Sequence, residues 1–276
     1  MCSNFSTFNK LGIIAGNGDL PREIAYLYSK KAVQCFIAAI DGEADLGSIS
    51  NYNFEIFPIT SVGKIINFFY QHDVKNIILI GGIKRPNLSA LKLDIAGTEL
   101  LAQILKNKYF GDNKLLTVVA EYLEKKGFNV VSPLTILSSV NYGFLNYIDN
   151  SKLTKQDKLD IDLGIEIIKQ LSKFDIGQSV VIENGYVVGI EAAEGTNNLI
   201  QRCALLKKNN HSGVFVKIPK LYQDLRLDLP TIGPTTILQL AESKIKILAV
   251  SRNTVIVKPQ ETKSLSLKLN IDINIL

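Results

Sequence analysis

The sequence predicts an α/β protein, with a Rossmann-like parallel-sheet domain at the N-terminus and a distinct α/β domain at the C-terminus. In the first half, short runs rich in Ile, Val and Phe alternate with segments of helical period, which is the βαβ pattern of a parallel sheet. This alternation lapses after residue 133, and a β-hairpin signal follows. A chain of 276 residues also lies where single cores tend to divide. We expect domains at 1–133 and 153–276, joined by a linker region at 134–152.

The first half contains the elements expected of a doubly wound sheet. Strands are expected at Leu11–Ala15, Val33–Ile40, Phe54–Ile59, Asn76–Ile80 and Phe128–Val131. Helices are expected at Leu20–Lys30, Val62–His72 and Lys114–Lys126. Gly127 follows the last of these helices, where a glycine commonly ends a helix. The crossovers should be right-handed.

The second half has a different order of elements. One amphipathic helix is expected at Leu153–Leu171, capped by Thr154, and its Asp157, Asp160 and Asp162 should be largely solvated. Asn184-Gly185 is the preferred turn of a hairpin between Gln178–Glu183 and Tyr186–Ala192. The remaining elements are a helix to about Lys207, a strand at Gly213–Ile218, an extended segment at Gln223–Pro230, a helix at Thr235–Ser243, and strands at Ile247–Val250 and Thr254–Val257.

Composition indicates a globular protein with a buried core. Hydrophobic residues make up 46% of the chain and the mean hydropathy is +0.15. The most apolar run, Ile77–Ile83, is far shorter than the roughly 18 residues of a membrane span, and Met1–Lys10 lacks the apolar core of a signal peptide. We therefore expect a cytoplasmic protein. The net charge of +5 is not gathered in a basic tail, so nucleic acid is not an expected partner, whereas weak attraction to an anionic membrane surface remains open.

Cysteine and histidine are too few and too scattered for several kinds of site. Three cysteines and two histidines lie far apart in the sequence, which excludes a disulfide framework and argues against His-rich metal centres and Ser-His-Asp catalysis. Any metal should be a hard cation held by carboxylates, with magnesium the first expectation. Water is the expected nucleophile.

Two glycine-rich loops follow the first and fourth expected strands. They contain Gly16, Asn17 and Gly18 in one loop, and Gly81, Gly82, Lys84 and Arg85 in the other. Ligands bind beyond the carboxyl ends of parallel strands, so both loops are candidates for contact with a phosphorylated ligand. Pro21 replaces the third glycine of a dinucleotide fingerprint. The alternatives are a tight turn into a helix for the first loop and solvated charges for Lys84 and Arg85.

Charged residues alternate with leucines in Gln223–Pro230. In an extended segment Asp224, Arg226 and Asp228 would share one face. Pro230 favours that geometry because it pushes the preceding residue out of the helical region. Two carboxylates beside a guanidinium suit a divalent cation and a phosphate. The alternative is a half-buried strand with a solvated face.

A second group of charged residues follows the expected hairpin. It comprises Glu191, Glu194, Gly195 and Thr196, with Lys217 at the end of a later strand. If this group adjoins Asp224–Asp228, the carboxylates, Lys217 and Arg226 would form a magnesium-phosphate site. The alternatives are a solvated turn at a helix start, a helix cap at Gly195-Thr196, and a surface lysine.

Motifs in both halves carry a resemblance to a known family. They are Ile14-Ala15-Gly16-Asn17-Gly18 with Leu20-Pro21, Gly81-Gly82 with Arg85-Pro86, Gly111-Asp112, Asp175-Ile176-Gly177-Gln178, Glu191-Ala192-x-Glu194-Gly195-Thr196, Arg202, Gly213 with Val216-Lys217, Gln223-Asp224-x-Arg226-x-Asp228-x-Pro230, and Ile232-Gly233. In this order they make the chain resemble the UDP-2,3-diacylglucosamine pyrophosphatases of the LpxI type, which act in lipid A biosynthesis. The last stretch, Ser251–Leu276, matches this family poorly.

The resemblance implies a two-domain enzyme that binds its lipid substrate between the domains. It implies magnesium-dependent hydrolysis of UDP-2,3-diacylglucosamine to UMP and 2,3-diacylglucosamine 1-phosphate, with the catalytic domain at 153–276. An aspartate of the Gln-Asp-x-Arg-x-Asp motif is implied as essential, and it maps first to Asp224 and second to Asp228. Asn113 and Asn197 stand where acidic residues are expected, so no metal or catalytic role is carried over to them.

The resulting site assignment has three parts. Asp224, Asp228 and Arg226 are the expected catalytic residues, and Asp224, Asp228 and Glu191 the expected metal ligands. The expected substrate-binding residues are Gly16, Asn17, Gly18, Gly81, Gly82, Lys84, Arg85, Glu194, Gly195, Thr196, Lys217 and Gln223. Phe144, Leu145 and Tyr147 are candidates for acyl-chain contact, with core packing as the alternative.

The expected partners are the lipid-linked nucleotide and the surface of the inner membrane, and a homodimer is left open. Two other functions also remain open. One is a pyrophosphatase for soluble sugar nucleotides, and the other is a nucleotide-binding regulatory module without turnover.

Overall fold

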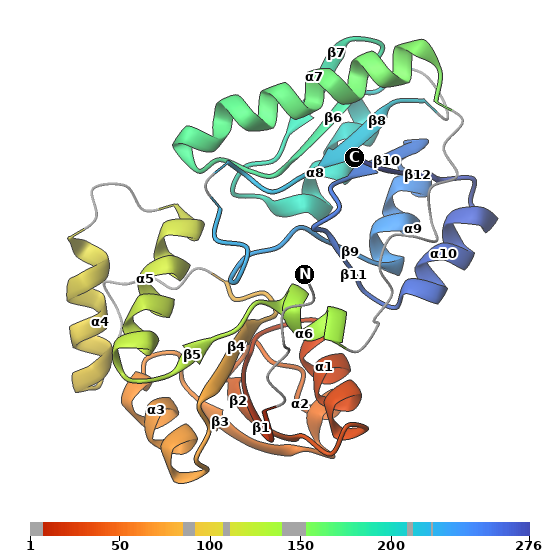
Figure 1. The fold of residues 1–276 in the computed structure, drawn as a ribbon. Helices are drawn as coiled ribbons and strands as arrows, with labels where there is room; N and C mark the ends of the chain where they lie inside the picture. Colours follow the sequence, from red (N-terminus) through yellow and green to blue (C-terminus); the bar gives the residue numbers. More distant parts are fainter. Residues whose placement is uncertain (1–7, 85–91, 107–110, 140–152, 209–211, 222) are drawn as a thin grey trace, which may run out of the picture. The chain divides into compact units, whose positions relative to one another are not determined.

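The computed structural model divides the chain into two compact units, residues 1–140 and 141–276 (Figure 1). It describes all residues except 1–7, 85–91, 107–110, 140–152, 209–211 and 222. Each unit has its own five-stranded sheet with helices packed on it, so the predicted α/β class is confirmed. No helix in the described part of the chain is long and apolar enough to cross a membrane.

The sheet of the first unit is entirely parallel, in the order β3-β2-β1-β4-β5. Its strands are β1 (Lys10–Ala15), β2 (Gln34–Ile40), β3 (Asn53–Phe57), β4 (Asn76–Ile80) and β5 (Asn129–Val130). These are the strands predicted from the sequence, with ends that differ by at most two residues. The order of strands switches between the central strands β1 and β4: β2 and β3 lie on one side of β1, and β4 and β5 lie on the other. That point is where open α/β sheets bind ligands.

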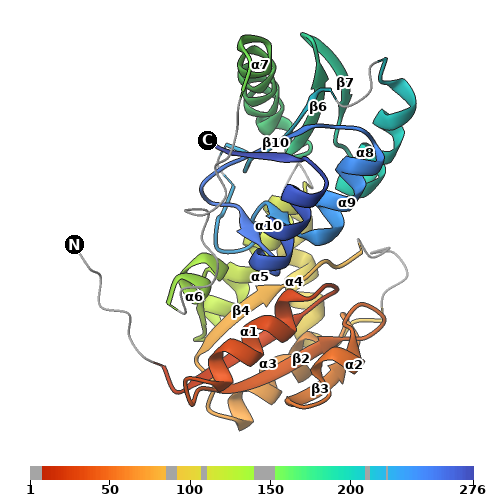
Figure 2. The same cartoon turned by 90° about the vertical axis from the view of Figure 1, so that its right-hand side faces the viewer.

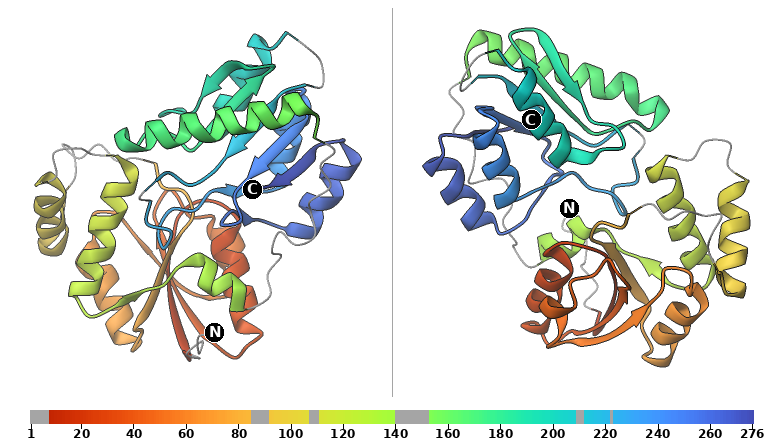
Figure 3. Two further views of the ribbon diagram at one scale, coloured as in Figure 1. Left: turned by 45° about the horizontal axis from the view of Figure 1, so that its top comes forward. Right: turned by 180° about the vertical axis from the view of Figure 1, so that it is seen from behind.

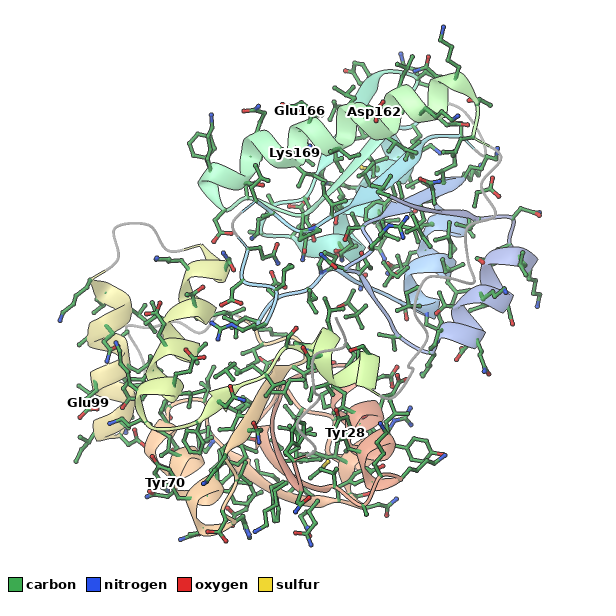
Figure 4. The ribbon with its side chains drawn as sticks, viewed as in Figure 1. Tyr28, Tyr70, Glu99, Asp162, Glu166 and Lys169 are labelled. Carbon is green, nitrogen blue, oxygen red and sulfur yellow. The ribbon has the colours of Figure 1, made fainter. Side chains whose placement is uncertain are left out.

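Helices cover both faces of this sheet. Figure 1 shows α1 (Leu20–Ser29) and α6 (Pro133–Ser139) on one face, and α3 (Val62–Gln71), α4 (Ile95–Leu105) and α5 (Asp112–Lys125) on the other. The Tyr28 hydroxyl, labelled in Figure 4, donates to the Ile136 carbonyl at 3.2 Å and joins α1 to α6. Helices α4, α6 and the short α2 (Leu46–Ile49) were not predicted. Residues 134–139, expected in the linker, therefore belong to α6.

The sheet of the second unit is mixed, in the order β12-β10-β8-β6-β7. Its strands are β6 (Ser179–Glu183), β7 (Tyr186–Ile190), β8 (Val214–Lys217), β10 (Ile247–Val250) and β12 (Asp272–Ile275). Strands β8, β10 and β12 are parallel, whereas β6 runs antiparallel to β8 and β7. Asn184 and Gly185 both have positive φ, as the predicted Asn-Gly hairpin turn requires. Strands β9 (Thr231–Ile232) and β11 (Val255–Ile256) form a separate parallel pair.

Helices lie on both faces of this second sheet, as Figures 2 and 3 show. Helix α7 (Lys155–Leu171) packs on one face through Ile161 and Ile168. The other face is covered by α8 (Gly195–Leu206), α9 (Pro234–Glu242) and α10 (Pro259–Lys268). The outer side of α7 carries Asp162, Glu166 and Lys169, which point away from the sheet in Figure 4. Helix α10 and strand β12 lie in the C-terminal stretch and were not predicted.

Helix α7 is fastened to the hairpin by a buried aspartate. Thr154 caps the helix through a capping box with Asp157, as predicted. Asp160, however, is only 2% exposed, and its carboxylate accepts hydrogen bonds from the amides of Asn184 (2.8 Å) and Gly185 (2.7 Å). The expectation of a solvated Asp160 is wrong because its carboxylate is turned toward the hairpin, where it accepts from these two backbone amides.

Candidate functional site

The two glycine-rich loops of the first unit lie against each other at the carboxyl ends of β1 and β4. The amide of Asn17 donates to the Gly82 carbonyl at 2.7 Å, and the amide of Gly82 donates back to the Asn17 carbonyl at 3.0 Å. A Cβ at Gly16 would lie 2.4 Å from the Gly82 carbonyl oxygen. Glycine is therefore required here by the close approach of two backbones. The structure brings together two loops that lie far apart in the sequence.

Carboxylates lie beside basic residues around these loops, and Asp19 pairs with Arg22 at 3.8 Å. Lys84 donates its backbone amide to the Glu43 carboxylate at 3.2 Å, which ties the loop after β4 to the loop after β2. Asp19 and Glu23 lie at the N-terminus of α1, where acidic side chains offset the positive end of the helix dipole. Arg85, the other predicted cation, lies outside the described residues.

In the second unit, Asp224–Asp228 forms a turn rather than the predicted extended segment. The amides of Leu227 and Asp228 donate to the Asp224 carbonyl at 3.0 and 3.3 Å, and the Arg226 amide donates to the Asp224 carboxylate at 2.9 Å. An aspartate that accepts from the amide two residues later stabilises a turn in this way. The prediction of one shared charged face is therefore wrong. Leu227 and Leu229 are nonetheless buried, each 8% exposed.

Arg226 folds back onto Asp224. Its Nε and Nη2 atoms donate to the two oxygens of the Asp224 carboxylate at 3.0 and 2.8 Å. The hydrogen bond from this guanidinium lowers the pKa of Asp224 and outweighs the partial burial that raises it. The two residues thus form one unit in which a carboxylate orients a half-exposed guanidinium.

Asp228 is held separately, by Gln223. The Gln223 amide nitrogen donates to the Asp228 carboxylate at 2.7 Å, and its oxygen accepts from the Lys220 backbone amide at 2.7 Å. Gln223 is 8% exposed, so this side chain is an internal brace rather than a surface group. Lys220 in turn forms an ion pair with Asp175, just after the 3₁₀ turn η3 (Ser172–Phe174). The turn that carries both aspartates is therefore anchored to the end of α7.

Lys217 is the buried cation of the site. It ends β8 and is 6% exposed. Its Nζ donates to the Thr196 hydroxyl at 2.8 Å, and that hydroxyl donates to the Glu191 carboxylate at 2.8 Å. Burial lowers the pKa of Lys217, while the charges of Glu191 and Asp228 raise it. The structure thus brings Glu191, Thr196 and Lys217 together, and Asp228 lies close enough for its charge to act on Lys217.

The hydrogen-bonding capacity of Lys217 is only partly used. An ammonium has three N–H donors, and among the described residues Thr196 is the only acceptor within hydrogen-bond distance. A buried donor without a partner is costly, so a native site usually supplies one from protein, water or ligand. The arrangement suits an anionic ligand at the end of β8.

Glu194 points to a different partner. Its carboxylate accepts from Nε and Nη2 of Arg202 at 3.0 and 2.8 Å, and Arg202 also donates to the Ile190 carbonyl at 2.7 Å. The hydrogen bond from Arg202 lowers the pKa of Glu194. This pair joins the start of α8 to the end of β7. Gly195, with φ of +76°, follows Glu194 and is the first residue of α8.

The carboxylates of the site do not form a ready-made metal centre. Within the described ranges, no group of three or more His, Cys, Asp or Glu residues is placed to hold one metal ion. Asp224 is bound by Arg226, and the two oxygens of Glu191 accept from Thr196 and from the Gln178 amide at 3.2 Å. The expected ligands Asp224, Asp228 and Glu191 are therefore not gathered in one preformed magnesium site.

Several residues that build the site were not assigned to it from the sequence. Gln178 and Gly177 support Glu191, and a Cβ at Gly177 would lie 2.1 Å from the Glu191 carbonyl oxygen. Lys220 and Asp175 anchor the turn. Gly177 and Gln178 lie in the motif Asp175–Gln178. This motif contributes to the family resemblance, but it does not indicate that these residues contact Glu191. The acyl-chain candidates Phe144, Leu145 and Tyr147 lie outside the described residues.

Comparisons with known proteins agree over both units. Residues 10–140 match the family model of the LpxI N-terminal domain, and residues 146–274 match that of the LpxI C-terminal domain. The chain is also 30% identical over 264 residues to the UDP-2,3-diacylglucosamine pyrophosphatase LpxI of Caulobacter vibrioides, covering 90% of this chain and 92% of that protein. With two family models spanning most of the sequence and a relative at this identity, the chain belongs to the LpxI family.

Proposed function

We propose that this protein hydrolyses the pyrophosphate bond of UDP-2,3-diacylglucosamine, giving UMP and 2,3-diacylglucosamine 1-phosphate for lipid A biosynthesis. The supporting relative is named for this pyrophosphatase activity. The observation that carries the proposal is Lys217, a buried ammonium that has unused donors and lies close enough to Asp228 for their charges to interact. Such a group recognises a phosphate and is poorly explained as packing.

The proposed reaction uses water as the nucleophile. The water oxygen forms a bond to one phosphorus while the bond from that phosphorus to the bridging oxygen breaks, and the bridging oxygen leaves on the other phosphate. Asp228 orients the water and accepts its proton. Lys217 and Arg226 neutralise the charge that develops on the phosphate oxygens, which is the main protein contribution in phosphoryl chemistry.

The remaining predicted residues receive supporting roles in this proposal. Asp224 orients the guanidinium of Arg226, and Gln223 holds Asp228. The loops at Gly16–Gly18 and Gly81–Gly82 are included as contacts for part of the nucleotide, because ligands bind beyond the carboxyl ends of parallel strands.

Magnesium dependence is part of the proposal. The residues present do not form a finished magnesium site, so no step is assigned to the ion. When bound, magnesium would neutralise negative charge on the pyrophosphate. Addition of a chelator tests this dependence, and full activity in excess EDTA would contradict it.

We also propose peripheral contact with the cytoplasmic surface of the inner membrane. The proposed substrate carries acyl chains, and a net charge of +5 favours anionic lipids. Cosedimentation with phosphatidylglycerol vesicles should exceed that with phosphatidylcholine vesicles and fall at high salt. A homodimer stays a separate expectation, which sedimentation equilibrium can measure.

The decisive experiment measures UMP released by the purified protein from UDP-2,3-diacylglucosamine in the presence of magnesium. Asp228→Asn and Asp224→Asn should each lower kcat by about 100-fold or more, because a general base or an oriented charge is lost. Asn can still accept the amide hydrogen bonds, so both variants should stay folded. Equal activity on UDP-N-acetylglucosamine would instead indicate a soluble sugar-nucleotide pyrophosphatase. Tight binding without product would indicate a regulatory module.

A further inference from the structure

The side chains behind Lys217 form a chain of hydrogen bonds that ends in a carboxylate. Lys217 donates to Thr196, Thr196 donates to Glu191, and the second oxygen of Glu191 accepts from the Gln178 amide. Glu191 is 6% exposed. Both of its oxygens are thus occupied within the protein, which is the arrangement of a carboxylate that supports a neighbour.

The direction of these hydrogen bonds is determined by chemistry. An ammonium can only donate, so the Thr196 hydroxyl must accept from Lys217 and place its own hydrogen toward Glu191. Thr196 lies in the first turn of α8, and its branched side chain has few allowed rotamers in a helix. The helix start limits the rotamers of Thr196, its hydrogen bond to Glu191 holds the hydroxyl in place, and that hydroxyl holds the Nζ of Lys217.

A second buried lysine in the same unit shows what a structural cluster looks like. Lys207 donates to the carbonyls of Ser212 and Lys244, and its Nζ lies 4.0 Å from the Glu183 carboxylate. Its donors are used by the protein itself. The Thr196 contact leaves Lys217 donors free for a ligand instead.

We propose that Glu191 and Thr196 are positioning residues that hold the Lys217 ammonium against a pyrophosphate, and that Glu191 is not a metal ligand. This inference rests on the proposed function. It assigns the Glu-x-x-Glu-Gly-Thr segment to orientation of a cation rather than to magnesium coordination. Glu191 acts on the substrate only through Thr196 and Lys217.

The test compares Thr196→Val, Thr196→Ser and Glu191→Gln. Thr196→Val keeps the shape but removes the hydrogen bond to a charged group, so kcat/KM should fall by about 10- to 100-fold. Thr196→Ser restores the hydroxyl and should return activity to within about 3-fold of wild type. Glu191→Gln should lower kcat/KM while the magnesium concentration for half-maximal activity stays unchanged.

Matched controls separate this effect from general loss of packing. Thr262 is fully buried and donates to the Val257 carbonyl at 2.7 Å, so Thr262→Val makes the same chemical change elsewhere in the second unit. Glu183 is a buried carboxylate near Lys207, so Glu183→Gln is the control for Glu191→Gln. Both controls should lower thermal stability but keep wild-type kcat/KM per folded molecule.

A binding measurement keeps the inference testable if the proposed reaction fails. Calorimetry with inorganic pyrophosphate should show weaker binding to Thr196→Val than to wild type by about 10-fold, with recovery in Thr196→Ser. No turnover by wild type would overturn the proposed function alone. Wild-type turnover and binding in Thr196→Val would overturn the positioning role. An increased magnesium requirement in Glu191→Gln would show that Glu191 is a metal ligand after all.

Discussion

Two ends of the second sheet each hold a buried lysine beside a buried glutamate. At one end, Glu183 accepts from the Ser212 hydroxyl and the Lys208 amide, with Lys207 nearby. At the other end, Glu191 accepts from the Thr196 hydroxyl and the Gln178 amide, and Lys217 donates a hydrogen bond to the same hydroxyl. Burial lowers the pKa of both lysines. By composition, burial and charge the two clusters are nearly the same.

They differ in what the lysine does with its donors. Lys207 donates to two backbone carbonyls, those of Ser212 and Lys244. Lys217 has a single acceptor among the described residues and faces the turn that carries Asp228. The comparison teaches that a buried ion cluster does not by itself indicate an active centre. The unused hydrogen-bonding capacity of a buried group is the more informative signal.

The largest difference in activity between the two ends of the second sheet should appear when Lys217 or Lys207 is replaced by methionine. Lys217→Met should lower kcat/KM by about 100- to 1,000-fold, because a cation facing the reacting phosphate is lost. Lys207→Met should keep kcat/KM per folded molecule and lower the free energy of unfolding by about 1–3 kcal/mol, because it leaves carbonyls without a donor. Steady-state kinetics and urea unfolding of both variants measure this. Equal losses of activity would remove the distinction.

A smaller difference in activity is expected when the glycine beside each cluster is replaced by alanine. Gly177→Ala would place a Cβ 2.1 Å from the Glu191 carbonyl oxygen at φ of +53°, so it should displace Glu191 and lower activity by about 10-fold or more. Gly213→Ala, at φ of +86°, would place its Cβ 3.0 Å from the Ile182 carbonyl oxygen. It should cost about 1–3 kcal/mol of stability through backbone strain and spare the activity of the folded fraction. Unchanged kcat in Gly177→Ala would argue against precise placement of Glu191.

The smallest expected effect is on the free energy of unfolding at acid pH. The pKa of Asp224 is lowered by Arg226, so between the lowered pKa and the ordinary value of about 3.9 the unfolded chain binds more protons than the native one. This contribution is present above the unfolded pKa and is lost as the pH falls through the folded one. Arg226→Gln should make the fall in stability between pH 5 and pH 2 less steep.

Urea unfolding at several pH values measures this slope. Arg252→Gln makes the same substitution at an exposed arginine and should retain the wild-type slope. A parallel fall in wild type and Arg226→Gln would show that the guanidinium does not stabilise the ionised Asp224.

Local patterns predicted much of the fold. The strands of the first sheet, the Asn-Gly hairpin and the Thr154 cap follow from side-chain period and backbone preference, which are properties of a few consecutive residues. The glycine loops after β1 and β4 were also correctly placed at strand ends. The C-terminal α10 and β12 were missed. Helix α10 has a polar composition and a weak apolar face, so little in the sequence distinguishes it from a loop.

The candidate site was only partly predictable. Glu191, Thr196, Lys217 and Asp228 were each identified from the sequence. Glu191 and Thr196 follow the hairpin, Lys217 ends a strand, and Asp228 belongs to the segment in which charged residues alternate with leucines. The turn at Asp224–Asp228 was not predicted, because alternation of charged residues and leucines is equally compatible with a strand. There the aspartate's own hydrogen bond to the Arg226 amide outweighs the preference for extension.

The sequence by itself determined the α/β class, the strands of the first sheet and the residue types available for phosphate chemistry, because these depend on local period and composition. Tertiary structure decided which of those residues act together. Packing of α8 on the second sheet places Thr196 between Glu191 and Lys217, and anchoring of the turn to the end of α7 places Asp228 near the same lysine. Such contacts join segments far apart in the chain, and the hydrogen bonds that a buried group lacks are defined only after the chain has folded around it.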